Sequence, residues 1–124
     1  MALVLVVEDE LSIAKLLEDV LTDEGYRVVI AGNGRQALEV AARQTPSIVI
    51  TDFMMPVMDG AALLRHWTAD AVLRKVPVII MSSLPEATVV QRCSGYVAFV
   101  RKPFRILEIV DNVAQHVRPA AAGG

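Results

Sequence analysis

Short, continuously apolar runs alternate along the chain with longer segments in which apolar residues recur every three or four positions. Runs without polar alternation are typical of strands that are buried on both faces of a sheet. Such runs predict five strands, at residues 3–7, 26–31, 47–50, 76–81 and 97–100. The segments between and after them must then supply the connections of the sheet.

Amphipathic helices are predicted where the apolar residues recur at helical spacing. They cover residues 11–24, residues 35–43, the stretch that carries Leu63, Leu64 and Trp67, and residues 106–117. One further helix is predicted at residues 85–93, where the periodicity is weakest. This helix, the fourth along the chain, is expected to be short or irregular.

Strand and helix alternate five times, and parallel neighbouring strands need crossover connections of the kind that helices provide. The pattern therefore predicts a single α/β domain, with a doubly wound parallel sheet and helices on both faces. A chain of 124 residues has the length of one ordinary domain. Polar ligands of such sheets bind beyond the carboxyl ends of the strands, so functional side chains are expected at these ends.

Composition narrows the class of protein further. A hydrophobic fraction of 54% is enough to fill a core, and the formal charge of -2 offers no overall positive field for nucleic acid. Cys93 is the single cysteine, and the chain lacks the paired Cys and His spacings of a zinc site, which favours a reducing compartment such as the cytoplasm. The longest apolar runs are far shorter than the roughly 20 residues that cross a bilayer, so no membrane segment is expected.

Several conspicuous residues are interpreted as structural. The Gly-Asn-Gly sequence at residues 32–34 lacks the downstream Lys-Ser of a phosphate-binding loop and predicts a turn before the second helix. Trp67 lies on the apolar stripe of its helix and is expected in the core. His66 and His116 have no nearby ligand set and are expected at the surface.

Polar side chains follow most of the predicted strands. Glu8 and Asp9 follow the first strand, Asp52 the third, Ser82 the fourth, and Lys102 the fifth. Clustered carboxylates repel one another unless a cation joins them, and hard oxygen ligands favour Mg²⁺ over zinc. Because Mg²⁺ binds one or two carboxylates together with phosphate oxygens, the pattern indicates a divalent metal and phosphoryl chemistry.

With these residues the chain resembles the response regulator receiver family of two-component signalling, in the manner of the chemotaxis receivers. The resemblance rests on four ordered motifs and extends from residue 3 to about residue 117. The motifs are Val6-Val7-Glu8-Asp9-Glu10, Asp52-Phe53-Met54-Met55-Pro56-Val57-Met58-Asp59-Gly60, Pro77-Val78-Ile79-Ile80-Met81-Ser82 and Lys102-Pro103-Phe104. The resemblance implies a flavodoxin-like sheet with the strand order 2-1-3-4-5.

The resemblance also implies a role for each matching residue. Asp52 would accept a phosphoryl group from a histidine kinase or a histidine phosphotransfer protein. Asp9, assisted by Glu8, would bind Mg²⁺ together with Asp52 and the backbone carbonyl of Met54. Lys102 would neutralise charge on the transferring group from the other side, because such transfer depends mainly on positioning and charge stabilisation.

The remaining matches concern switching and the shape of the site. Ser82 would turn toward the phosphoryl oxygens, and Phe99 would be the aromatic residue that moves with it. Pro56 and Gly60 would shape the loop after Asp52, and Pro103 would follow a cis peptide bond. Ser82 and Lys102 are expected at a solvated strand edge, where replacing them costs little stability.

The expected protein is thus a receiver domain over residues 1–118, with a flexible tail at residues 119–124. It would act as a signalling switch, catalysing only its own phosphorylation and dephosphorylation at Asp52, and would signal to a downstream effector through protein contacts or pass the group onward. One alternative is a Mg²⁺-dependent phosphatase with Asp52 as nucleophile, although such enzymes usually carry an acid where this chain has Met54. Another is an interaction module that works without phosphorylation. The interval between Ser82 and Lys102 is shorter than the resemblance implies, which leaves the partner of that surface open.

Overall fold

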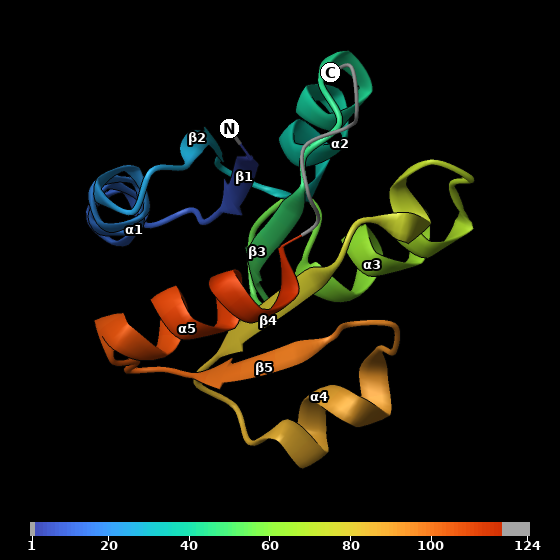
Figure 1. Cartoon of the computed structure of the whole chain (residues 1–124). Helices are drawn as coiled ribbons and strands as arrows, with labels where there is room; N and C mark the ends of the chain where they lie inside the picture. Colours follow the sequence, from blue (N-terminus) through green and yellow to red (C-terminus); the bar gives the residue numbers. More distant parts are fainter. Residues whose placement is uncertain (1, 118–124) are drawn as a thin grey trace.

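Five parallel strands form the centre of the molecule in the computed structural model, which describes residues 2–117. The strands are β1 (Leu3–Val7), β2 (Arg27–Ala31), β3 (Ile48–Asp52), β4 (Val78–Ser82) and β5 (Ala98–Arg101). They pair in the order β2-β1-β3-β4-β5, so the predicted strand order and the doubly wound sheet are confirmed (Figure 1). The expected tail at residues 119–124 lies outside the described residues.

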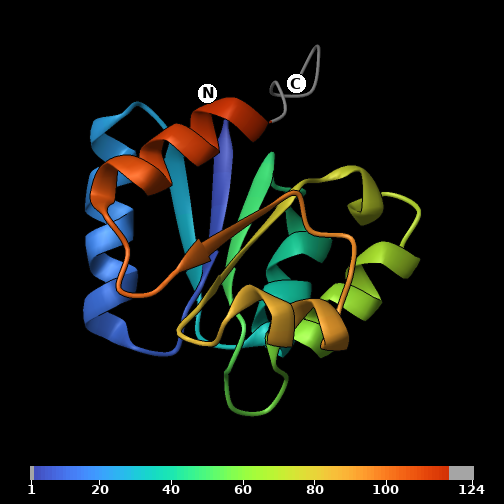
Figure 2. The same ribbon diagram turned by 90° about the horizontal axis from the view of Figure 1, so that it is seen from below.

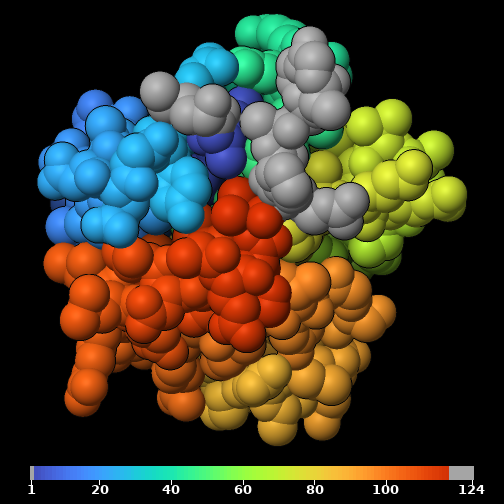
Figure 3. All heavy atoms as spheres, in the orientation of Figure 1, coloured from blue at the N-terminus to red at the C-terminus, as the bar shows by residue number. Residues whose placement is uncertain are grey.

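The helices cover both faces of this sheet. They are α1 (Leu11–Asp23), α2 (Gly34–Arg43), α3 (Gly60–Ala69), α4 (Glu86–Arg92) and α5 (Ile106–His116), with a single 3₁₀ turn, η1 (Leu73–Lys75). Figure 2 shows α1 and α5 on one face of the sheet and α2, α3 and α4 on the other. In the space-filling view of Figure 3, the atoms of α1 and α5 lie side by side.

Two hydrophobic cores result from the alternation of side chains along each strand. In β1, Val4 and Val6 face α1 and α5, whereas Leu5 and Val7 face α2 and α3. All five residues of β1 are buried, as are all five of β3 and of β4. Burial on both faces is why these strands have continuous apolar runs instead of an alternating pattern.

The boundaries of four strands, β2 to β5, differ from the prediction by one or two residues. β3 and β4 extend into the polar residues Asp52 and Ser82, because backbone pairing to the neighbouring strand does not depend on side-chain polarity. β4 begins at Val78, two residues later than predicted, because Val76 ends the unpredicted turn η1. The fourth helix is short, as expected, with seven residues and only Val89 buried.

The residues interpreted as structural are placed largely as expected. Asn33 caps α2, and its side chain accepts a hydrogen bond from the Gln36 amide at 3.0 Å. His66 is exposed and His116 is half-buried. Trp67 is fully buried, and its indole N–H donates to the Val76 carbonyl at 3.2 Å. Within residues 2–117, no helix has the length and apolar character needed to cross a membrane.

Trp67→Phe is expected to lower the free energy of unfolding by about 2 kcal/mol, because it leaves a cavity and an unpaired buried carbonyl at Val76. Urea unfolding followed by circular dichroism measures the change. His66→Ala, at an exposed position on the same helix, is the matched control and should change the free energy by less than about 0.5 kcal/mol. Equal stability of Trp67→Phe and wild type would contradict this packing role.

Candidate phosphoacceptor site

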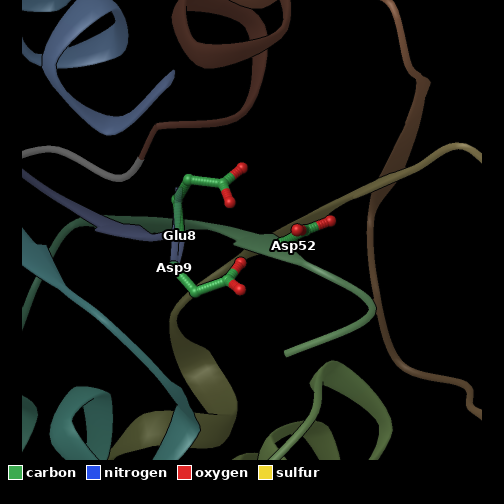
Figure 4. Close-up of side chains that lie close together, drawn as sticks. All are labelled: Glu8, Asp9 and Asp52. Atoms are coloured by element: carbon green, nitrogen blue, oxygen red, sulfur yellow. The ribbon is translucent and has the colours of Figure 1, made fainter. Parts of the chain in front are cut away.

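Three carboxylates meet at the carboxyl edge of the sheet. Glu8 and Asp9 follow β1, and Asp52 is the last residue of the adjacent strand β3. One ligand oxygen from each of the three lies within 4.8 Å of the others, and Figure 4 shows the side chains converging. Glu8 and Asp52 are buried, with 2% and 8% of their surface exposed, whereas Asp9 is exposed.

Lys102 joins this cluster from the end of β5. Its ammonium lies 2.8 Å from Oε1 of Glu8 and 3.1 Å from Oδ2 of Asp52. The side chain is only 17% exposed. The peptide bond between Lys102 and Pro103 is cis, as the resemblance implied. One ammonium therefore offsets two buried carboxylates at once.

The balance of burial and charge shifts the pKa of each of these groups. Burial raises the pKa of Glu8 and that of Asp52, and the hydrogen bonds and charge of Lys102 offset this only in part. For Lys102, burial by itself would lower the pKa. The hydrogen bond to Glu8 and the negative charges of Asp52 and Glu8 outweigh it, so the pKa of Lys102 is raised. The cluster therefore favours an additional positive charge.

The donor atoms of the cluster suit a hard divalent cation. They are carboxylate oxygens, and one of the three side chains, that of Asp9, faces solvent. Both oxygens of Glu8 already accept hydrogen bonds, one from Lys102 and one from the Glu10 amide at 3.1 Å. Asp9 and Asp52 are thus the more available ligands, and an ion such as Mg²⁺ that retains several waters fits an open site of this kind.

Ser82 lies at the end of β4 but not at a solvated edge. Only 1% of its surface is exposed, and its Oγ accepts a hydrogen bond from the Leu84 amide at 3.0 Å. The expectation of a solvated position was therefore wrong for Ser82, because β4 pairs with β3 up to Met81 and with β5 up to Ser82. Lys102 is also more buried than expected.

The other expected site residues have distinct environments. Phe99 is half-buried in β5 and packs against the core formed with α2, α3 and α4. Gly60 has no room for a side chain, since a Cβ there would lie 2.8 Å from the Asp52 carbonyl oxygen. Pro56 and Met54 are exposed in the loop between β3 and α3, with 56% of Met54 accessible.

Two features of this loop were not anticipated from the sequence. Val57 has a φ of 68°, in the left-handed region that β-branched residues rarely adopt. Gly34, at the start of α2, contacts the loop so closely that a Cβ would lie 2.8 Å from the Met58 carbonyl oxygen. The Gly-Asn-Gly motif predicted a turn there, but no local signal in the sequence indicates the long-range contact.

Fold and site together define a doubly wound α/β domain with an acidic, lysine-bridged centre at the carboxyl edge of its sheet. Comparison with known families identifies the family to which this domain belongs. The model of the response regulator receiver domain matches residues 4–114. The chain belongs to the response regulator receiver domain family of two-component signalling.

Individual relatives are consistent with this membership. The chain is 34% identical over 116 residues to sporulation initiation phosphotransferase F of Bacillus subtilis, covering 92% of both chains. It is similar to the receiver domain of a signal transduction histidine kinase from Syntrophus aciditrophicus, with 31% identity, a TM-score of 0.86, and coverage of 93% of this chain and 89% of that one. The chain spans about half the length of further curated relatives that are described as transcriptional or DNA-binding regulators.

A third similar structure concerns the metal. It is the receiver domain of a sensor histidine kinase of Pseudomonas aeruginosa PAO1, described with a magnesium ion coordinated in its active-site cleft. The identity is 28%, the TM-score is 0.83, and the match covers 93% of this chain and 96% of that one. The two chains share the fold, and the acidic cluster of the present chain lies at the carboxyl edge of its sheet.

Asp52→Asn is expected to raise the free energy of unfolding of the metal-free protein at pH 7, by about 1 kcal/mol, because the variant buries no negative charge at this position. The pKa of folded Asp52 lies above its ordinary value of 3.8. At a pH below 3.8, protonated Asp52 therefore makes its full contribution to the stability of the wild type. That contribution is lost as the pH rises through the folded-state pKa. The difference in free energy of unfolding between Asp52→Asn and wild type should therefore grow as the pH rises through the pKa of folded Asp52.

Urea unfolding in the presence of a chelator, at a series of pH values, measures this difference. The matched control is Asp59→Asn, which changes an exposed acid that caps α3 through its side chain. Asn also serves well as a cap, so this control should have nearly the stability of wild type at pH 7. A wild-type protein as stable as Asp52→Asn at pH 7 would show that Asp52 carries no burial penalty.

Proposed function

We propose that Asp52 accepts a phosphoryl group from a histidine kinase or a histidine phosphotransfer protein. The observation that carries the proposal is the position of Asp52, which shares one acidic cluster with Glu8 and Asp9 and lies 3.1 Å from the ammonium of Lys102. A carboxylate is a weak nucleophile, so the reaction depends on positioning and on neutralising charge on the transferred group. The residues around Asp52 offer both.

The transfer exchanges one bond to phosphorus for another. A carboxylate oxygen of Asp52 forms a bond to phosphorus, while the bond from phosphorus to the donor's imidazole nitrogen breaks. The electron pair of that bond stays on the imidazole. The product is an acyl phosphate on Asp52, and Lys102 is placed to offset the negative charge that arrives with it.

Asp9, Asp52 and the backbone carbonyl of Met54 would hold Mg²⁺, with Glu8 beside them. When bound, the ion supplies charge neutralisation of phosphoryl oxygens. Glu8 contributes in a second way, since its hydrogen bond to Lys102 holds the ammonium toward Asp52. The receiver thus acts on itself as a signalling switch and not as an enzyme with an external product.

Ser82 and Phe99 would convert the modification into a change of shape. The Ser82 hydroxyl accepts a hydrogen bond from Leu84 but gains a new partner for its own proton when a phosphoryl group is present. A contact made in only one state is what shifts a population between two conformations. Phe99 lies in β5 opposite Ile80, two residues before Ser82 along β4, and would respond to movement of Ser82.

The output would pass through contacts with a downstream protein or by transfer of the phosphoryl group onward. Direct contact with nucleic acid is not proposed for this unit, because its formal charge of -2 provides no attractive field. A cytoplasmic location is proposed on the basis of the single cysteine, Cys93, which is free in the structure. Partners in the cytoplasm would then have direct access to the site.

Incubation with Mg²⁺ and the small phosphodonor phosphoramidate should add one phosphoryl group to the wild-type protein, measured by intact mass. Asp52→Asn should take up none, because the amide lacks the nucleophilic oxygen. Asp59→Asn should be phosphorylated like wild type, and Asp9→Ala should lose most of its response to Mg²⁺. Phosphorylation of Asp52→Asn at the wild-type rate would refute the assignment, whereas an unmodified wild type would favour a module that works without phosphorylation.

Ser82→Ala should separate modification from switching. The variant loses the acceptor for the Leu84 amide and should be less stable by about 1 kcal/mol, yet remain folded. It should still be phosphorylated, but the aromatic resonances of Phe99 should no longer shift on phosphorylation. Ser83→Ala, at the exposed neighbouring position, is the control and should behave like wild type. A full Phe99 shift in Ser82→Ala would remove Ser82 from the switch.

A further inference from the structure

The loop between β3 and α3 is held in place by its own backbone. Near its two ends, the Gly60 amide donates to the Phe53 carbonyl at 2.8 Å. At its tip, the Met58 amide donates to the Pro56 carbonyl at 2.7 Å, which closes a γ-turn around Val57. These bonds account for the course of the loop but leave the Met58 carbonyl free to bind elsewhere.

That carbonyl is bound by the start of α2. The Gly34 amide donates to the Met58 carbonyl oxygen at 3.0 Å, which gives a partner to a helix N-terminal amide that has none within its helix. Gly34 is buried, and a Cβ there would lie 2.8 Å from both Cγ and the carbonyl oxygen of Met58. The contact therefore requires glycine for reasons of space.

The anchor for this contact is rigid. Asn33, the N-cap residue of α2, accepts a hydrogen bond from the Gln36 amide at 3.0 Å. This bond caps α2 and fixes its first turn. A loop that is bound to such a start cannot move without breaking the contact at Gly34.

Val57 has a backbone conformation that its own side chain disfavours. A β-branched residue disfavours a φ of 68°, and Val57 gains no compensating burial, since 76% of its surface is exposed. A strained conformation of this kind persists only where the surroundings impose it. Residues that fix Met58 contribute to imposing it, and Gly34, which comes from another part of the chain, binds the Met58 carbonyl directly.

From this geometry we infer that Gly34 is a positioning residue for the phosphorylation site, which it serves by clamping Met58 and thereby setting the loop that carries Met54, whose carbonyl is a proposed metal ligand. The inference rests on the proposed function, because Met54 matters only where a metal is bound beside Asp52. Gly34 touches neither the metal nor the phosphoryl group. Its effect is transmitted through the backbone between Met54 and Met58.

Gly34→Ala tests the clamp against the matched variant Gly32→Ala. At position 32 a Cβ would lie 3.2 Å from the end of the Gln36 side chain, which can shift, whereas at position 34 it meets backbone. Titration with Mg²⁺, without any phosphodonor, should show a dissociation constant about tenfold higher for Gly34→Ala, as is typical when a supporting contact of a metal site is lost. The Mg²⁺ dissociation constant of Gly32→Ala should stay within about twofold of the wild-type value, because this variant keeps the contact between Gly34 and Met58.

The double variant Gly34→Ala, Met58→Ala should recover part of the lost affinity, because it removes the Met58 Cγ from the collision. A merely structural role would lower the melting temperature and leave the metal affinity unchanged. Ala at the first position of a helix is otherwise favourable, so a loss of affinity reports the collision and not helix propensity. Equal Mg²⁺ affinity in Gly34→Ala, Gly32→Ala and wild type would overturn the inference.

A measurement on the wild type keeps the test valid should Gly34→Ala fail to fold. In the ¹⁵N-labelled wild-type protein, the Gly34 amide resonance should shift with Mg²⁺ at the same half-saturation as the Asp9 amide, and an insensitive Gly34 resonance would overturn the inference. If the wild type binds no Mg²⁺ and accepts no phosphoryl group on Asp52, the proposed function itself fails. If the wild type does both while Gly34→Ala binds Mg²⁺ like Gly32→Ala, only the role of Gly34 is refuted.

Discussion

The site depends on one electrostatic constraint, the burial of two carboxylates beside a third at the end of a sheet. Glu8 and Asp52 are almost fully buried, and the ammonium of Lys102 lies within 3.1 Å of both. Because one positive charge only partly offsets two buried negative charges, the pKa of each carboxyl stays raised and the cluster favours a further cation. This excess of negative charge adapts the site to a divalent metal and to a reaction that is governed by charge.

The parallel sheet is what brings these charges together. β1 and β3 are neighbours and end at the same edge, so Asp52 meets Glu8 and Asp9 although it lies more than forty positions after them along the chain. β5 lies two strands away from β3, and the long side chain of Lys102 extends back to Asp52. Helix packing on both faces holds the strands, while the site itself remains on the loops at the open edge.

The sequence predicted the fold closely because burial on both faces leaves an unmistakable apolar run in each central strand. The bounds of β1 were predicted to the residue, and α1, α2 and α5 to within about one residue at either end, which is the usual spread of helix boundaries. The ends of β3 and β4 were missed because backbone pairing continues through Asp52 and Ser82, where the apolar signal stops. The turn η1 was missed because it has no apolar period of its own.

The sequence indicated which polar side chains gather at the site, because Glu8, Asp9, Asp52 and Lys102 each come within two residues of the end of a predicted strand. Tertiary structure alone decided the quantities that depend on neighbours from elsewhere in the chain. These include the burial of Ser82 between β3 and β5, the pairing of Lys102 with both Glu8 and Asp52, and the contact of Gly34 with Met58. Periodicity reports which face of an element is buried, whereas distances between loops are set only when the elements pack.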